Sequence, residues 1–199
     1  MIKFKKKIHI DYQGWELNFF DKSKNFRTYQ FELIRKFLKG NTAEVGPGNG
    51  TNLRYYNKYL DKIDLYEPTK SLFINLKKNF KSNSKITIYN KKFVTKKKYN
   101  TILYLDVLEH IKEDKSEVIK ALASTKKNGH LIINVPAYSH LYSKFDNDVG
   151  HYKRYEKKDI KIILKNVKFA ALDLKYYDSI GYILSLLSKL TSSDYKHRF

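Results

Sequence analysis

The stretch that decides the fold is AEVGPGNG, residues 43–50, in which three glycines occupy every second position behind an acidic residue and a valine. The whole chain contains only eight glycines, so this cluster marks a place where the backbone must bend sharply. A glycine-rich bend after a buried strand lets the chain turn, lets the next helix pack close to the sheet and lets the backbone approach a ligand. The pattern therefore predicts a ligand-binding loop between a strand and a helix.

Strand and helix signals alternate on both sides of this bend. Apolar runs predict strands at 42–46, 63–67, 86–90, 101–107 and 130–136, and helical spacing predicts helices at 26–40, 52–60, 69–80 and 114–126. The last helix should begin with a capping arrangement of Asp114 and Glu117 and end at Asn128 and Gly129. This alternation predicts a three-layer α/β sandwich with a mostly parallel sheet. Ligands of such sheets bind beyond the carboxyl ends of the strands, where residues 46–50 would lie.

We expect a single domain over residues 1–199, because a chain of this length can bury a core without further staples. Residues 1–40 should form an N-terminal helical segment that ends at Gly40. Its expected apolar face consists of Phe26, Tyr29, Leu33, Ile34, Phe37 and Leu38.

The composition narrows the functional classes. There is no cysteine, so neither a thiol nucleophile nor a zinc site is expected, and no set of metal ligands is predicted. The N-terminus lacks the apolar core of a signal peptide, and no stretch reaches the roughly 18 apolar residues of a membrane span. We therefore expect a cytoplasmic protein without a transmembrane segment.

The formal charge of +20 has two interpretations. A basic surface is typical of proteins that bind nucleic acid or anionic lipid. The lysines are, however, spread from end to end and accompany many Asn, Ile and Tyr residues, which biased codon usage would also produce, while arginine is scarce. We favour a solvated surface and regard a nucleic-acid partner as the weaker interpretation. The lysine clusters at 4–7, 91–92 and 96–98 stay candidate anion contacts.

The glycine spacing excludes two common phosphate loops. A dinucleotide fingerprint needs a glycine at the sixth position from Gly46, where this chain has Thr51, and no Lys-Ser/Thr pair follows as in a P-loop. Glu67 ends the next predicted strand, twenty-one residues past Gly46. A carboxylate there can accept both hydroxyls of an unphosphorylated ribose, although it could also be a solvated strand-end residue. The two features together favour an adenosine-type ligand.

The chain resembles the class I S-adenosylmethionine-dependent methyltransferases, and within them the small-molecule group similar to the quinone-biosynthesis enzymes. The resemblance covers about residues 19–182. It implies a Rossmann-like fold with a sheet of six or seven strands, the count depending on whether the C-terminal strand is present. It rests on AEVGPGNG and IDLYEP, on YLDVLEHIKED (104–114), on NGHLIINVPAY (128–138) and on FDNDVGHYKRY (145–155).

The resemblance implies a set of residues that bind S-adenosylmethionine. Glu44 would orient the loop and reach the methionine part, and Glu67 would hold the ribose. Asp106 would contact the methionine moiety or lie near the methyl group, and the motif continues over the cofactor from Val107. Asn90 stands where the family often has an acidic residue for the adenine amine. The complete expected set is Glu44, Gly46, Gly48, Gly50, Glu67, Asn90, Asp106 and Val107.

The resemblance also implies a polar lid over residues 137–155, whose substrate-binding positions are Asp146, His151, Arg154 and Tyr155. Arg154 would meet a polar or anionic substrate group, or alternatively form a salt bridge with Asp146. A hydroxyl acceptor needs a base with a pKa near neutral, so His110 and His151 are the catalytic candidates. Each could instead only orient its own loop.

The chain departs from the family at its C-terminus, where a last antiparallel strand usually follows a helix such as residues 179–190. Residues 169–177 would then be an unprotected edge strand or would pair differently. The apolar face around Ile183, Leu186, Leu187 and Leu190 would need a partner. A homodimer contact, a peripheral membrane contact and a weakly active protein are the alternatives. The expected function is methyl transfer to oxygen or carbon of a small molecule. Its rivals are an RNA methyltransferase and a non-catalytic cofactor-binding protein.

Overall fold

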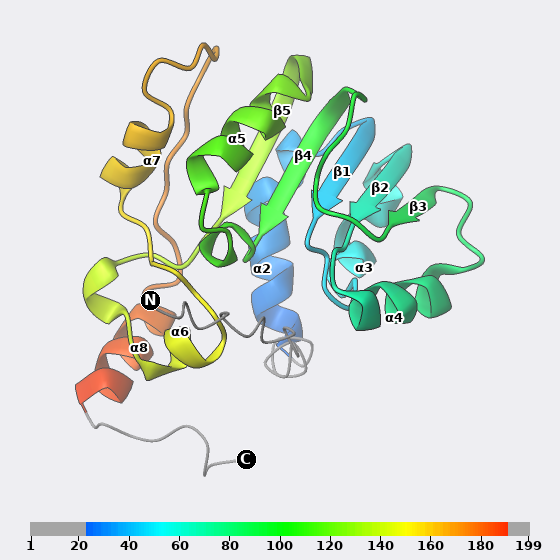
Figure 1. Ribbon diagram of the computed structural model, residues 1–199. Coiled ribbons are helices and arrows are strands. Elements are labelled where there is room, and N and C mark those ends of the chain that lie inside the picture. Colours follow the sequence, from blue (N-terminus) through cyan, green and yellow to red (C-terminus); the bar gives the residue numbers. More distant parts are fainter. Residues whose placement is uncertain (1–22, 191–199) are drawn as a thin grey trace, which may run out of the picture.

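The computed structural model describes residues 23–190, so the lysine cluster at 4–7 and most of the predicted N-terminal helical segment lie outside the described residues. The described residues form one sheet of five parallel strands in the order β3-β2-β1-β4-β5 (Figure 1). The strands are β1 (Asn41–Val45), β2 (Lys62–Tyr66), β3 (Ile86–Tyr89), β4 (Tyr99–Leu105) and β5 (Thr125–Asn134). The α/β class with a parallel sheet is therefore confirmed.

The central strand is β1, which pairs with β2 through Val45 and Tyr66 and with β4 through Val45 and Tyr104. Strand order reverses beside β1, because the chain moves outward through β2 and β3 and then returns to the other side at β4. All five strands end at the same edge of the sheet, the lower edge in Figure 1. This is the edge at which open α/β sheets bind their ligands.

Helices cover both faces of the sheet. The α-helices are α2 (Lys24–Ile34), α3 (Leu53–Tyr56), α4 (Lys70–Phe80), α5 (Asp114–Ala123), α6 (Lys144–Asp148), α7 (Lys157–Ile163) and α8 (Ser179–Leu190). Short 3-10 turns are η1 (Arg35–Phe37), η2 (Asn57–Tyr59), η3 (Leu108–His110) and η4 (Ser139–Leu141). Figure 1 shows α2 and α5 on opposite sides of the sheet.

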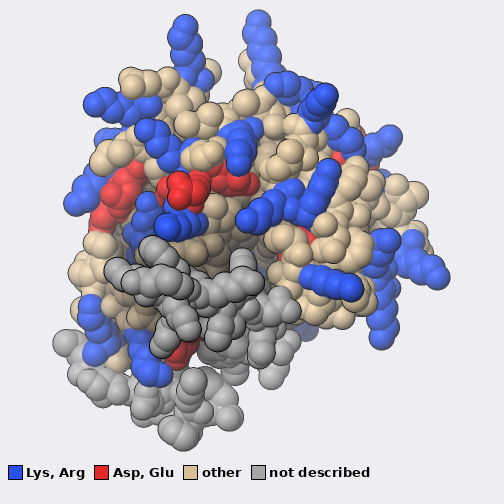
Figure 2. Space-filling view, viewed as in Figure 1, with Lys and Arg blue, Asp and Glu red and all other residues tan. Residues whose placement is uncertain are grey.

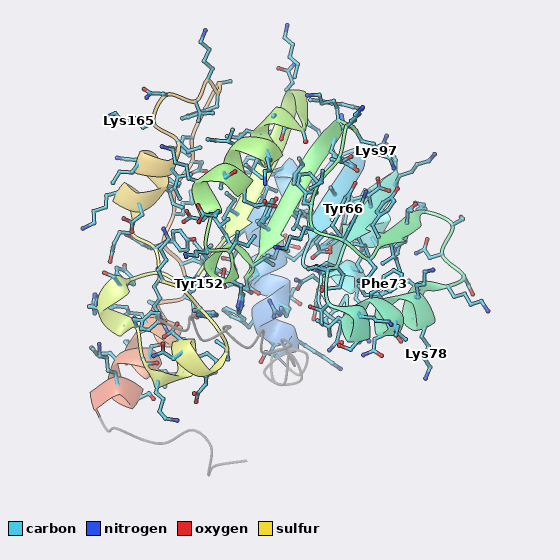
Figure 3. All side chains as sticks on the ribbon, viewed as in Figure 1. Tyr66, Phe73, Lys78, Lys97, Tyr152 and Lys165 are labelled. Carbon is cyan, nitrogen blue, oxygen red and sulfur yellow. The ribbon has the colours of Figure 1, made fainter. Side chains whose placement is uncertain are left out.

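Each face of the sheet has its own core, because successive residues of a strand point to opposite sides. On one face Leu65 and Leu103 pack with Phe31 of α2 and Leu76 of α4. On the other face Tyr66, Tyr104 and Ala121 of α5 surround Phe93, whose ring meets that of Tyr66 edge-on at 5.0 Å. Figure 3 shows Tyr66 over the middle of the sheet.

The sixth strand predicted at 169–177 is not part of the sheet. Within the described residues this segment has no strand pairing, and Figure 1 shows it running down beside β5 toward α8. Phe169 and Leu172 are exposed instead of alternating between core and solvent. Tyr177 is anchored elsewhere, since it accepts a hydrogen bond from Gln30 of α2. The sheet of the described residues thus has five strands, fewer than the six or seven expected.

The predictions for helices α5 and α2 were wrong in detail. Helix α5 ends at Ala123, and Asn128 is a left-handed residue inside β5, close to a register shift between β4 and β5. Asp114 does not cap that helix through a capping box, because Glu113 is the N-cap residue and makes no side-chain cap bond. Helix α2 buries Arg27 and Phe31, whereas Tyr29 and Leu33 of the predicted face are exposed.

Helix α8 presents an apolar face to solvent, with Ile180 71% exposed and Ile183, Leu184 and Leu187 each more than half exposed. No helix within residues 23–190 is long and apolar enough to cross a membrane. The dimer and membrane contacts expected for this face stay predictions.

Candidate functional site

The glycine loop after β1 turns in left-handed steps. Gly46, Gly48 and Gly50 have φ values of 63°, 57° and 77°, which L-residues with a side chain rarely adopt. A Cβ atom on Gly46 would lie 2.8 Å from Cγ2 of Val107, and one on Gly50 would lie 2.6 Å from the Phe80 ring. The glycines therefore allow the loop after β1 to pack closely against the loop after β4 and against α4. They also leave the backbone of this loop accessible to a ligand.

Glu67 lies against this loop at the end of β2. Its Oε2 accepts a hydrogen bond from the Gly48 amide at 3.3 Å, and its Oε1 accepts one from the Thr69 amide at 2.8 Å. Burial raises the pKa of Glu67, while these amide bonds oppose that increase. The structure thus brings the predicted ribose-binding carboxylate and the glycine loop together.

Asn90 occupies a supporting position beside Glu67. Its side-chain amide donates to the carbonyl oxygens of Glu67 and Pro68, at 2.9 and 3.1 Å. It therefore fixes the turn between β2 and α4, and its predicted contact with adenine stays a prediction.

Glu44 is buried beneath the loop. The Tyr56 hydroxyl donates a hydrogen bond to its Oε2, and the side chain is 1% exposed. Burial raises the pKa of Glu44 from 4.5 to about 7, against the opposing bonds from Tyr56 and Asn52. This position suits the predicted role in orienting the loop better than a direct contact with a cofactor.

Asp106 follows β4 with a φ of 58°, a strained value for a residue other than glycine. Its side chain is 42% exposed, yet burial is the largest influence on its pKa and raises it. Solvent therefore reaches the carboxylate although protein surrounds it. Arg27 contacts Oδ2 at 3.4 Å and Asn134 donates to Oδ1 at 2.5 Å.

A closed ring of hydrogen bonds holds Asp106, and the sequence analysis missed four of its members. Arg27 donates to Gln30 at 2.9 Å, and Gln30 donates to the Tyr177 hydroxyl at 2.8 Å. Tyr177 in turn donates to Asn134 at 2.6 Å, and Asn134 returns to Asp106. The ring joins α2, the ends of β4 and β5 and the segment before α8. The signal in the sequence that could have indicated this ring was Arg27, a charged residue on the apolar stripe of α2.

The predicted lid is a loop closed at its base, because Ala137 and Tyr155 form a parallel bridge. Inside it, Ser143 and Asp146 form the capping box of α6, and Asp146 is fully buried. Gly150, at φ 84°, returns the chain so that His151 Nδ1 lies 2.8 Å from Asp146 Oδ1. Burial opposes ionisation of Asp146, but bonds from His151 and Arg154 outweigh it and lower its pKa to about 2.

Two predicted substrate contacts have other partners. The Arg154 Nε donates to both oxygens of Asp146, at 2.9 and 3.1 Å, which is the salt bridge considered as the alternative. Tyr155 is 2% exposed, and its hydroxyl donates to the Leu108 carbonyl and to Asp114. It supports η3, and its predicted contact with a substrate stays a prediction.

The candidate catalytic histidines, His110 and His151, lie next to each other. The rings of His110 and His151 meet edge-on with their centroids 4.7 Å apart, and Glu109 Oε1 is 3.9 Å from His151 Nε2. Burial lowers the pKa of His110 to about 4, and neighbouring His151 adds to the effect. Burial raises the pKa of Glu109 well above its usual value, with Asp106 the next contributor. The cluster adjoins the glycine loop, since Val107 packs against Gly46.

Comparison with known proteins gives a family. A family model described as a methyltransferase domain matches residues 18–174. No curated protein sequence matches the chain significantly.

Solved structures share the fold at low sequence identity. A putative methyltransferase from Bacillus halodurans C-125 is 14% identical, with 69% of this chain and 66% of that chain covered and a TM-score of 0.58. The N-methyltransferase NodS from Bradyrhizobium japonicum WM9, solved with S-adenosyl-L-homocysteine, is 14% identical, with coverages of 71% and 73% and a TM-score of 0.59. The chain thus spans just under two thirds of the Bacillus protein.

Proposed function

The chain belongs to the methyltransferase domain family, and from this premise we propose that it transfers a methyl group from S-adenosylmethionine to an oxygen or carbon atom of a small molecule. The observation that carries the proposal is the contact between Glu67 and the glycine loop at the switch point beside β1. NodS, which has the same fold, was solved with the demethylated form of this cofactor.

The residues at this edge fit an adenosine bearing a charged sulfur. Three left-handed glycines let the backbone approach the ligand closely. The Glu67 carboxylate can accept both ribose hydroxyls besides its two amide partners, because a carboxylate has about four lone-pair sites. Asp106 offers a negative charge to the amino group of the methionine part. When bound, the cofactor supplies an electrophilic methyl group; the protein has to align the acceptor with it.

The acceptor is proposed to lie between Asp106 and the lid, against His110 and His151. Because its pKa is about 4, His110 is neutral at pH 7 and holds a proton too weakly to act alone as a base. His151 is better placed, since Asp146 accepts from its Nδ1 and leaves Nε2 directed toward Glu109. His151 is therefore the histidine that we assign to acceptor activation, with Arg154 holding Asp146 in place.

RNA is the less favoured acceptor. Lys and Arg are spread over the visible face without forming one patch (Figure 2), and the labelled Lys78, Lys97 and Lys165 lie at three separate edges (Figure 3). Lys97, from one predicted anion-binding cluster, is paired with Asp64 at 2.7 Å. A nucleic-acid enzyme would be expected to concentrate such charges along a groove.

Two measurements test the proposal in sequence. Calorimetry with S-adenosyl-L-homocysteine should detect one binding site that Glu67→Ala abolishes, while Glu32→Gln on the exposed side of α2 preserves it. Transfer of a radiolabelled methyl group is then followed over lipid-quinone, amine, glycan and RNA fractions. Absence of cofactor binding by the folded protein would refute the proposal. Binding without transfer to any fraction would favour a non-catalytic protein, and salt-sensitive transfer to RNA would favour the rival enzyme.

A further inference from the structure

Three side chains of residue types that bind metals lie close together, near the edge of the sheet where the cofactor is proposed to bind. Glu109 and His110 come from η3, directly after β4, and His151 comes from the lid. Each offers a ligand atom, and these atoms all lie within 4.8 Å of one another. Two segments about forty residues apart in the chain thus place two imidazoles and one carboxylate around a common point.

Glu109 supplies the second observation. Its side chain is 1% exposed, and Oε2 has no hydrogen-bond partner in the described part of the chain. Its Oε1 lies 3.9 Å from His151 Nε2, which is too long for a hydrogen bond. Buried carboxylate oxygens are costly unless they are paired or coordinate a cation. Of the charged side chains that influence Glu109 most, the carboxylates of Asp106 and Asp146 outnumber the Arg154 guanidinium, so a cation is the partner that this oxygen lacks.

His151 is held as a metal-ligating histidine usually is. Its Nδ1 faces Asp146 at 2.8 Å, which fixes the ring and directs Nε2 toward Glu109. A carboxylate that accepts the other N–H of a ligating histidine is the common arrangement in metal sites. Figure 3 places Tyr152 below α5 near the strand ends, and its amide donates to the Glu109 carbonyl at 2.8 Å. The residue after His151 therefore fixes the lid to η3.

We propose that Glu109, His110 and His151 bind one divalent transition-metal ion, with Asp146 as the positioning residue. Two imidazoles and one carboxylate suit Zn²⁺, Mn²⁺, Fe²⁺ or Co²⁺ better than Mg²⁺, which prefers oxygen ligands. Three protein ligands leave coordination positions open, and the His151 side chain, 12% exposed, borders solvent. The sequence analysis predicted no metal ligands, because only the folded lid brings His151 to the Glu109-His110 pair.

The chemical role of this ion, unlike its binding, rests on the proposed function. An acceptor hydroxyl coordinated at an open position loses its proton to water more readily. Its oxygen then attacks the methyl carbon, a C–O bond forms, and the C–S bond breaks with its electron pair remaining on sulfur. The products are a methyl ether, a neutral thioether and one proton. In this role His151 acts on the acceptor through the ion.

The test uses untagged full-length protein, first stripped with a chelator. Titration with Co²⁺, followed by its visible absorption and by calorimetry, should show one ion per chain. Glu109→Gln and His151→Asn should weaken binding by more than the about 10–100-fold expected for loss of a supporting residue, which is the effect predicted for Asp146→Asn. Matched controls are Glu32→Gln on the surface of α2 and His130→Asn on β5, which should bind as the wild type does. Circular dichroism verifies the fold of each variant.

A measurement on the unmodified protein keeps the proposal testable if the variants do not fold. With Mn²⁺ bound, pulsed electron paramagnetic resonance should detect couplings to histidine nitrogen. Absence of Co²⁺ and Mn²⁺ binding at millimolar concentration, absence of nitrogen coupling, or wild-type affinity in folded Glu109→Gln would each overturn the proposal. Calorimetry with S-adenosyl-L-homocysteine in chelator separates the two ideas: cofactor binding without metal binding rejects only the metal site, and the reverse result rejects only the cofactor assignment.

Discussion

The replacement Glu44→Gln should change how stability depends on pH, because Glu44 is the buried acid beneath the glycine loop. Its pKa is raised from 4.5 to about 7 in the folded protein, chiefly by burial. Between these values the unfolded chain has ionised this group while the folded chain keeps it protonated. The unfolded state therefore binds fewer protons, and the free energy of unfolding falls as pH rises from 4.5 to 7.

The size of the effect follows from the same two values. One unit of pKa difference corresponds to about 1.4 kcal/mol, so the contribution lost across this interval is about 3 kcal/mol. Glutamine keeps an oxygen that can accept from Tyr56 but has no charge to bury. Relative to wild type, Glu44→Gln should therefore gain stability progressively above pH 4.5 and reach a constant advantage above pH 7.

Urea unfolding followed by circular dichroism at a series of pH values from 4.5 to 8 measures this difference. Subtracting wild type from variant removes the titrations that both proteins share, including those of Glu67 and Glu109. Glu32→Gln is the control, because Glu32 pairs with Arg35 on the exposed surface of α2. A difference that stays constant with pH, or one that favours wild type as pH rises, would refute the reasoning.

Three further predictions concern the strand-end edge. Glu67→Gln should weaken S-adenosyl-L-homocysteine binding about 10-fold or more, because hydrogen bonds to a charged group are worth about 1.5–3 kcal/mol. Calorimetry measures this affinity, and an unchanged value would argue against a ribose contact. Gly46→Ala should lower the free energy of unfolding, measured in urea, by about 1–3 kcal/mol, because it strains a left-handed residue against Val107. The double variant with Val107→Ala should recover part of this loss, and no recovery would contradict the packing argument. Tyr177→Phe should cost about 1–3 kcal/mol by leaving a gap in the partly buried hydrogen-bond ring. Tyr152→Phe, at an exposed position, should stay near wild type, so equal effects of the two replacements would count against the ring.

The alternation of strands and helices could be predicted because its signals are local. The apolar run before Gly46 and the stripe containing Leu72 and Leu76 each occupy a few consecutive turns or pleats, and both are buried as expected. The positions of Glu67 and the glycine loop followed from the rule that parallel strands end at one edge. These inferences needed no knowledge of which distant segments meet.

The errors came from residues whose partners are far away or whose local signal is ambiguous. Asn128 resembles a helix terminator, but its left-handed conformation serves a bend in β5 where the register with β4 shifts. Arg27 interrupts the apolar pattern of α2 because it pairs with Asp106, 79 residues away. Tyr177 pairs with Gln30 on α2, 147 residues away, and its segment does not join the sheet. No periodicity within one segment contains such information.

The position of β1 in the middle of the sheet has a consequence for synthesis of the chain. One side of β1 pairs with β2 soon after it is made, but the other side pairs with β4, where Thr42 lies opposite Thr101. At typical translation rates of about 5–20 residues per second, this side waits on the order of 3–12 s before its partner has been synthesised. The growing chain thus exposes an unpaired edge of its central strand for seconds on the ribosome, and cellular chaperones would be expected to act in that interval.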